Sequence, residues 1–188
     1  MKYLQYKQKW QREKGFTLVE TLVAITILLV AIVGPMTIAA RGLQTAFYAR
    51  EQITAFSLAQ EGVELIREKR DENALSHSGN WLQGVPSGLC GSSNPDGCGL
   101  DIRGGSFLNC NGNNCQLKYD SAALPGNRGF YTYTAGTPSL YTRRIFVTET
   151  VNGKEALVTV KVTWQSGLFG AQRTVTVQSR IFNQYNNL

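Results

Sequence analysis

The order of apolar and polar residues divides the chain into four parts that follow a short basic leader, residues 1–15. The first part, residues 16–40, is an almost uninterrupted apolar run with one charged side chain, Glu20. As a helix, a run of this length would be about 37 Å long, which is enough to cross the hydrocarbon core of a bilayer. The pattern therefore predicts a membrane-spanning helix over residues 16–40, with Glu20 close to its start.

Residues 41–72 are predicted to continue this helix, in amphipathic form, into an external domain. Charged residues occupy much of the segment, and apolar residues recur at near-helical spacing at Leu43, Phe47, Ile53, Phe56, Val63 and Ile66. Such spacing places apolar side chains on one face of a helix. We expect that face to pack against a sheet.

A helix-breaking pair, Gly34 and Pro35, lies inside the apolar run. Proline lacks the amide hydrogen that an α-helix uses, so we expect a kink at this point. The alternative is a proline that a membrane helix tolerates without any functional role.

The second half of the chain predicts a loop region followed by a sheet. Residues 73–129 are rich in Gly, Ser, Asn and Pro, which predicts long loops with short strands near Leu100–Arg103 and Gln116–Tyr119. Residues 130–188 contain alternating apolar and polar positions, and Asn152-Gly153 is a typical hairpin turn. The strands expected there are Phe130–Thr134, Leu140–Val151, Ala156–Gln165 and Gln172–Phe182. A long helix followed by an antiparallel sheet makes the predicted fold class α+β.

The loop region contains all of the cysteines, which are Cys90, Cys98, Cys110 and Cys115. Basic residues before the apolar run favour a cytoplasmic N-terminus, so the loop region is expected on the outer side, where disulfides form. Four cysteines allow three pairings. We favour Cys90–Cys98 with Cys110–Cys115, because short loops close easily.

Composition narrows the range of functions. The chain has 19 basic and 13 acidic residues, but residues 1–15 hold five of the bases and one of the acids. The rest is therefore nearly neutral, and no basic run outside the leader indicates nucleic-acid binding. Arg143 and Arg144 are expected to be solvated or to pair across strands rather than to bind a ligand.

No catalytic or metal-binding pattern is found. His77 is the only histidine, and no nucleophile elbow, phosphate-binding loop or zinc-protease motif accompanies it. The cysteine spacings do not match a zinc site, and Asp96, Asp101 and Asp120 do not follow the spacing of an EF-hand. We therefore expect no enzyme activity, no cofactor and no bound metal.

The most specific motif is Lys14-Gly15-Phe16-Thr17-Leu18-Val19-Glu20, which joins the basic leader to the apolar run. It closely resembles the N-terminal motif of type IV pilins and of the pseudopilins of type II secretion. An ordinary signal peptide has a shorter apolar core that ends in small residues, for which Thr37–Ala40 is only a weak candidate. A plain signal anchor explains the length of the run but not Glu20, since a charge in a membrane segment is usually functional. The patterns Tyr141–Ile145 and Val160–Trp164 resemble the C-terminal pattern of PilV-like minor pilins and I-type pseudopilins.

The resemblance implies processing and assembly at the N-terminus. A membrane prepilin peptidase would cleave between Gly15 and Phe16 and methylate the new amine of Phe16. The absence of a side chain on Gly15 suits a close approach of the protease to the backbone. Glu20 would pair with the N-terminal amine of a neighbouring subunit, and such a pair sets the register of assembly more than it adds net stability.

The same resemblance implies the pilin fold, with the long helix packed on the sheet, and a minor pilin of a type IV pilus or related filament. Its partners would be the prepilin peptidase, other pilin subunits, the inner-membrane assembly platform and, before assembly, membrane lipid. It would cross the inner membrane once, with its N-terminus inside, before joining a cell-surface filament. The alternatives are a type II secretion pseudopilin and a membrane-tethered adhesin whose cysteine loop binds a ligand. Type IV pili as a class can bind DNA, although nothing in this chain indicates that it does.

Overall fold

The computed structural model describes residues 15–77, 79–112, 114–121, 129–166 and 170–184, so expectations for residues 1–14 lie outside it. The described chain begins with a long helix and ends in an antiparallel sheet, with two disulfides in the region between them. This confirms the predicted α+β, pilin-like fold. The chain divides into two compact units, and the boundary between them in the sequence lies between Phe47 and Tyr48.

The long helix, α1, spans Leu18–Leu75 and ends slightly beyond its predicted limit. From Tyr48 onward, its buried residues are Ala55, Leu58, Ala59, Gly62, Val63, Ile66 and Asn73. The predicted apolar stripe is therefore wrong in part, because Ile53 and Phe56 are 68% and 47% exposed. Small residues let the helix approach the sheet closely, since a Cβ atom on Gly62 would lie 2.9 Å from Val160 Cγ1.

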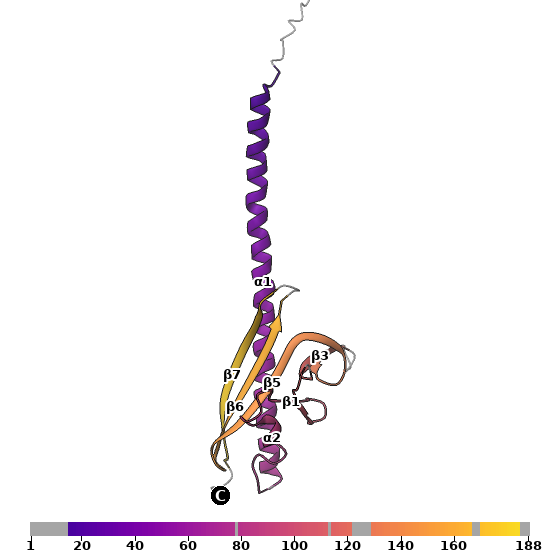
Figure 1. Ribbon diagram of the computed structural model, residues 1–188, viewed down its shortest axis with the longest axis vertical. Helices are drawn as coiled ribbons and strands as arrows, with labels where there is room; N and C mark the ends of the chain where they lie inside the picture. The colour runs from indigo at the N-terminus through magenta and orange to yellow at the C-terminus, as the bar shows by residue number, and fades with distance from the viewer. Residues whose placement is uncertain (1–14, 78, 113, 122–128, 167–169, 185–188) are drawn as a thin grey trace, which may run out of the picture. The chain divides into compact units, whose positions relative to one another are not determined.

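The sheet is built around one long central strand, β5 (Thr137–Val151). On one side β5 pairs with β6 (Glu155–Gln165), which in turn pairs with β7 (Gln172–Phe182). On its other side it pairs with β1 at Ile145 and with β3 from Thr137 to Thr142. The shorter strands are β1 (Cys98–Leu100), β2 (Phe107–Asn109), β3 (Gln116–Asp120) and β4 (Phe130–Thr132). Figure 1 shows β5, β6 and β7 running alongside the later part of α1.

The C-terminal strands confirm the predicted alternation. On β6 the residues facing the helix are buried, namely Val158, Val160, Val162 and Trp164. The turn between β5 and β6 lies where Asn152-Gly153 predicts it, but the loop has three residues because Lys154 also belongs to it. Gly153 has φ 68°, and Lys154 N donates a hydrogen bond to Val151 O at 3.0 Å. Glycine adopts this left-handed conformation without the steric cost of a side chain.

The middle of the chain is less regular, as expected, but it holds more structure than predicted. A short helix, α2 (Ser87–Cys90), precedes β1, and β2 is a strand that the sequence pattern does not reveal. The described part of this region is therefore tied to the sheet through β1 and β3 instead of forming a free loop.

Candidate functional site

The N-terminal turn of α1 is formed by the residues of the specific motif. Thr17 O accepts a hydrogen bond from Thr21 N at 3.2 Å, and Thr17 Oγ1 accepts one from Glu20 N at 3.3 Å. Thr17 thus caps the helix, and Glu20 occupies the position that glutamate takes in a capping box. A negative charge in the first turn also interacts favourably with the positive end of the helix dipole.

Residues 16–38 of this first unit present an apolar, uncovered surface. Large apolar side chains are exposed there from Phe16 at 78% to Ile38 at 73%. The most apolar stretch of α1 is not buried inside the described chain. By length and composition, α1 can therefore cross a membrane, which is the role predicted for residues 16–40.

Three threonine hydroxyls in the apolar run form hydrogen bonds to the backbone of their own helix. The hydroxyls of Thr21, Thr26 and Thr37 donate to backbone carbonyl oxygens three residues earlier, at 2.8, 2.8 and 2.7 Å. Such internal bonds reduce the cost of placing a hydroxyl in lipid. Glu20 is then the one charged side chain among described residues 15–40, and its carboxylate has no hydrogen bond within the described chain.

Gly34 and Pro35 lie inside the continuous helix α1. Because Pro35 has no amide hydrogen, it cannot donate the usual bond to the carbonyl of Ala31. Thr37 Oγ1 donates to the neighbouring Gly34 O, so one carbonyl of this turn gains a side-chain partner. The kink expected here stays a prediction.

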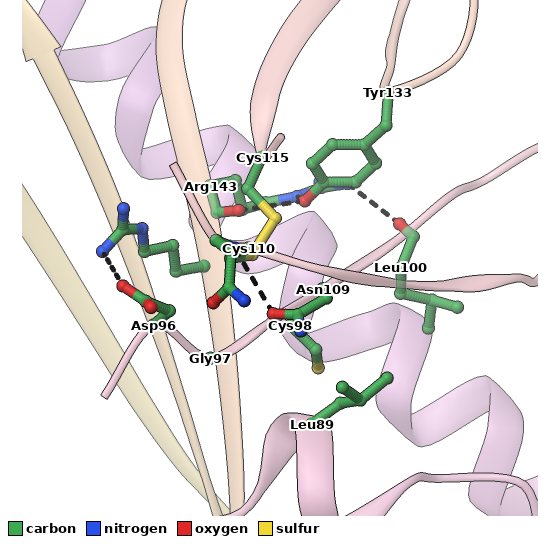
Figure 2. The surroundings of a disulfide bond; sticks show 12 residues. Leu89, Asp96, Gly97, Cys98, Leu100, Asn109, Cys110, Cys115, Tyr133 and Arg143 are labelled. Atoms are coloured by element: carbon green, nitrogen blue, oxygen red, sulfur yellow. Dashed lines mark hydrogen bonds and ion pairs between the residues drawn. A yellow bond between two sulfur atoms is a disulfide. The ribbon is translucent and has the colours of Figure 1, made fainter. Parts of the chain in front are cut away.

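Both disulfides are buried and have the pairing that their short loops favour, Cys90–Cys98 and Cys110–Cys115. Each is connected to β5: Cys98 lies opposite Ile145, and Cys115 O accepts a hydrogen bond from Arg143 N at 3.1 Å. Figure 2 shows the Cys110–Cys115 bond beside Tyr133 and Arg143. The disulfide region is thereby held against the central strand of the sheet.

The expectation that Arg143 is solvated or pairs across strands is wrong, because its side chain is fully buried and its ion-pair partner, Glu61, lies on α1. Its guanidinium donates to Glu61 Oε1 at 2.9 Å and to the Tyr133 hydroxyl at 3.0 Å. It also reaches the carbonyl oxygens of Leu58 and Leu100, at 3.3 and 3.4 Å. One buried cation thus connects α1, β1, β5 and the segment after β4. Arg144 is half-buried and forms an ion pair with Asp96 at 3.5 Å.

The charge of Arg143 is stabilised by its partners. Burial by itself lowers the pKa of the Arg143 guanidinium, but Tyr133 and Glu61 raise it by more, so its pKa lies above the ordinary value. Burial also raises the pKa of the Tyr133 hydroxyl, and the nearby Arg143 opposes only part of that increase. The described network is therefore ionic at Arg143 and neutral at Tyr133 over the physiological pH range.

The side chains considered as candidate ligands do not gather into a metal site in the described residues. No cluster of three or more His, Cys, Asp or Glu side chains able to hold a metal is found in the part of the chain that the structure describes. His77 is exposed in the turn after α1, and its Nδ1 lies 3.1 Å from Leu75 O. Asp101 is buried, but its carboxylate accepts hydrogen bonds from Arg103 N, Tyr133 N and the Thr134 hydroxyl.

The N-terminal segment is also the part that is similar to a known family. Residues 10–34 match the prokaryotic N-terminal methylation motif. The matched residues include Gly15, Phe16, Glu20 and Gly34. The methylation motif supports a filament subunit of the type IV pilin or pseudopilin kind, and it indicates a structural protein more than an enzyme. No curated protein and no solved structure is similar enough to count as a match.

Proposed function

We propose that this chain is a minor pilin, a low-copy subunit of a type IV pilus or related filament. A prepilin peptidase cleaves it between Gly15 and Phe16 and methylates the amine of Phe16. Residues 16–40 hold the subunit in the inner membrane, with the N-terminus inside, until it enters the filament. Residues 41–72 extend the helix into the external domain, which residues 73–129 and 130–188 complete.

One observation carries this proposal: the methylation motif leads into a helical segment, residues 16–40, whose apolar surface is uncovered and whose single charge is Glu20. A carboxylate in a membrane segment is costly and needs a partner. Within the described chain the Glu20 carboxylate has no hydrogen bond, so its partner is expected on another molecule. The amine created at Phe16 of a neighbouring subunit has the required charge.

The first test is the mass and the N-terminal sequence of the membrane-expressed chain, with and without a prepilin peptidase. The proposal predicts a peptidase-dependent start at Phe16 and a mass that is one methyl group heavier. An intact Met1, or a cut near Ala40, would contradict it and leave a tethered or secreted domain.

The second test separates processing from assembly. Glu20→Gln removes the charge with little change in shape, so the variant should be cleaved normally but should fail to enter filaments. Glu68→Gln is the matched control, because Glu68 is an exposed residue of the same helix, outside the apolar run. If both variants assemble equally well, Glu20 does not set the register.

A pseudopilin of a type II secretion system would have the same N-terminal segment. Co-expression of the tagged chain with each machinery distinguishes the two. The minor-pilin proposal predicts that the chain is recovered in sheared surface pili, and recovery only with the secretion complex would assign it to the pseudopilins.

A further inference from the structure

An open groove of about 500 Å³ lies in the second unit of the chain, lined by residues between Asn80 and Glu149. Its walls come from three parts of the chain: the turn over residues 80–85, the segment that runs from Ser87 of α2 into the loop closed by Cys90–Cys98, and Val147–Glu149 of β5. A groove of this size falls in the range typical of small-molecule sites. Assembly through the N-terminal helix gives this groove no role.

The walls of the groove are fixed by contacts behind them. The buried Asn73 of α1 donates a hydrogen bond from Nδ2 to Trp81 O at 3.1 Å, which ties the first wall to the helix. Within the loop closed by Cys90–Cys98, Asn94 Nδ2 donates to Leu89 O at 2.7 Å. The groove is therefore formed before any ligand arrives, which lowers the entropic cost of binding.

Four hydroxyl groups that have no hydrogen-bond partner among the described residues line the groove. Ser87, Ser92 and Ser93 are exposed, and Thr148 is half-buried beside them. None of these four hydroxyls forms a hydrogen bond within the part of the chain that the structure describes. Since a hydroxyl both donates and accepts, this set can bind a ligand that carries hydroxyl groups itself.

Besides Asn80 and Gly91, the remaining lining consists of three apolar side chains and one acid. Leu82, Val85 and Val147 provide the apolar surface. Glu149 Oε1 accepts a hydrogen bond from Trp81 Nε1 at 3.3 Å, so the carboxylate is held in place while it stays exposed. No Lys, Arg or His belongs to the described lining, and the groove therefore carries a single negative charge.

We propose that this groove binds a saccharide that is neutral or carries an amine. A sugar presents hydroxyls at its edges, which the serine and threonine hydroxyls can bind, and C–H groups on its faces, which can cover Leu82, Val85 and Val147. The Glu149 carboxylate attracts a protonated amine and repels acidic sugars and phosphates, for which the groove offers no cation. This proposal goes beyond filament assembly and rests on the external domain alone.

The test uses the full chain in a detergent that has no sugar headgroup. Binding is measured on an immobilised panel of neutral, amine-bearing and acidic mono- to tetrasaccharides, and the bound sugars are then titrated in solution. We expect binding within the neutral and amine-bearing groups, and at least about tenfold weaker binding of their acidic counterparts, a difference of about 1.4 kcal/mol. Binding to none of the panel, or equal binding of acidic sugars, overturns the proposal.

Two variants test whether the sugar binds in this groove. Ser93→Trp fills the groove from an exposed position, while Ser121→Trp makes the same exchange at an exposed residue outside it. Ser93→Trp should weaken binding at least about tenfold and Ser121→Trp should not, with unchanged thermal unfolding in both. Equal effects of the two variants would mean that the sugar binds elsewhere.

A third variant tests the role of the charge. Glu149→Gln keeps an oxygen that can accept from Trp81 but removes the negative charge, so it should weaken only the amine-bearing sugars. If neutral sugars lose the same factor, the charge argument is wrong. Cleavage at Gly15 is read separately by mass, so failure of this proposal leaves the filament proposal intact.

Discussion

Replacing either partner of the Arg143–Glu61 ion pair alone should destabilise the fold, but by unequal amounts. The side chain of Arg143 is 0% exposed, whereas that of Glu61 is 32% exposed. Replacing Glu61 by Met leaves the guanidinium buried with neutral acceptors only. Replacing Arg143 by Met leaves a carboxylate that water can still reach.

The magnitudes follow from this asymmetry. Removing one partner of a buried ion pair costs about 3–5 kcal/mol when the other charge stays buried, which is the value expected for Glu61→Met. Arg143→Met also loses several hydrogen bonds, each worth about 1 kcal/mol net, but it removes the buried charge itself. We therefore expect a cost of only about 1–2 kcal/mol, because replacing buried charges with well-packed apolar groups is often close to neutral.

The variant that carries both Glu61→Met and Arg143→Met completes a double-mutant cycle. With Arg143 already replaced, Glu61→Met should add little, so the double variant should unfold at almost the same urea concentration as Arg143→Met alone. Methionine and glutamate have similar helix propensities, so the exchange at residue 61 leaves α1 otherwise unaffected. The coupling between the two sites should then approach the full cost of Glu61→Met.

Urea unfolding of residues 48–188 measures all three variants at neutral pH. This unit contains every buried apolar residue of the described chain, from Ala55 to Ile181. A cost for Arg143→Met equal to or larger than that for Glu61→Met would refute the reasoning. It would mean that the contacts of Arg143 matter more than the burial of its charge.

Three further predictions use the same unfolding assay. Burial raises the pKa of the Tyr133 hydroxyl, so the unfolded chain loses this proton at a lower pH than the folded chain does. The free energy of unfolding should therefore fall above about pH 10, by up to about 1.4 kcal/mol per pH unit. Tyr133→Phe should make that fall less steep. Gly62→Ala should cost about 1–3 kcal/mol, since the added methyl meets Val160; a gain of about 1 kcal/mol, as at an open helix position, would contradict the packing. Replacing Cys90 and Cys98 together by Ala should cost about 2–3 kcal/mol, and reductant should destabilise this variant less than the unchanged chain, because only Cys110–Cys115 is left to reduce.

The order of elements could be predicted from the sequence because each follows from a local pattern. An apolar run of membrane length predicts a helix, and the strict alternation from Val158 to Trp164 predicts a strand with one buried face. The short loops within Cys90–Cys98 and Cys110–Cys115 favour the pairing that the structure has. In these cases residues near one another in the chain carry all the necessary information.

The sequence-based predictions were wrong where burial depends on residues that are distant in the chain. Ile53 and Phe56 have the apolar character of a buried stripe, but the helix face that meets the sheet carries Ala55, Ala59 and Gly62 instead. Hydrophobicity alone ranks these small residues low, although they allow the close approach to β6 that large side chains would prevent. The groove beside Cys90–Cys98 was equally hidden, because its walls come from three segments that only the fold brings together.

The burial of Arg143 could have been predicted from the alternation of residues along its strand. The buried positions of β5 are Tyr141, Arg143, Ile145 and Val147, so the arginine occurs in phase with the apolar residues. A charge on the inward face of an alternating strand needs a buried partner, and Glu61 lies on the inward side of α1 between Leu58 and Gly62. The side-chain period of two would therefore have placed Arg143 in the core. Its residue type, usually solvated, suggested the opposite, and for a residue in register with three buried neighbours the period is the stronger argument.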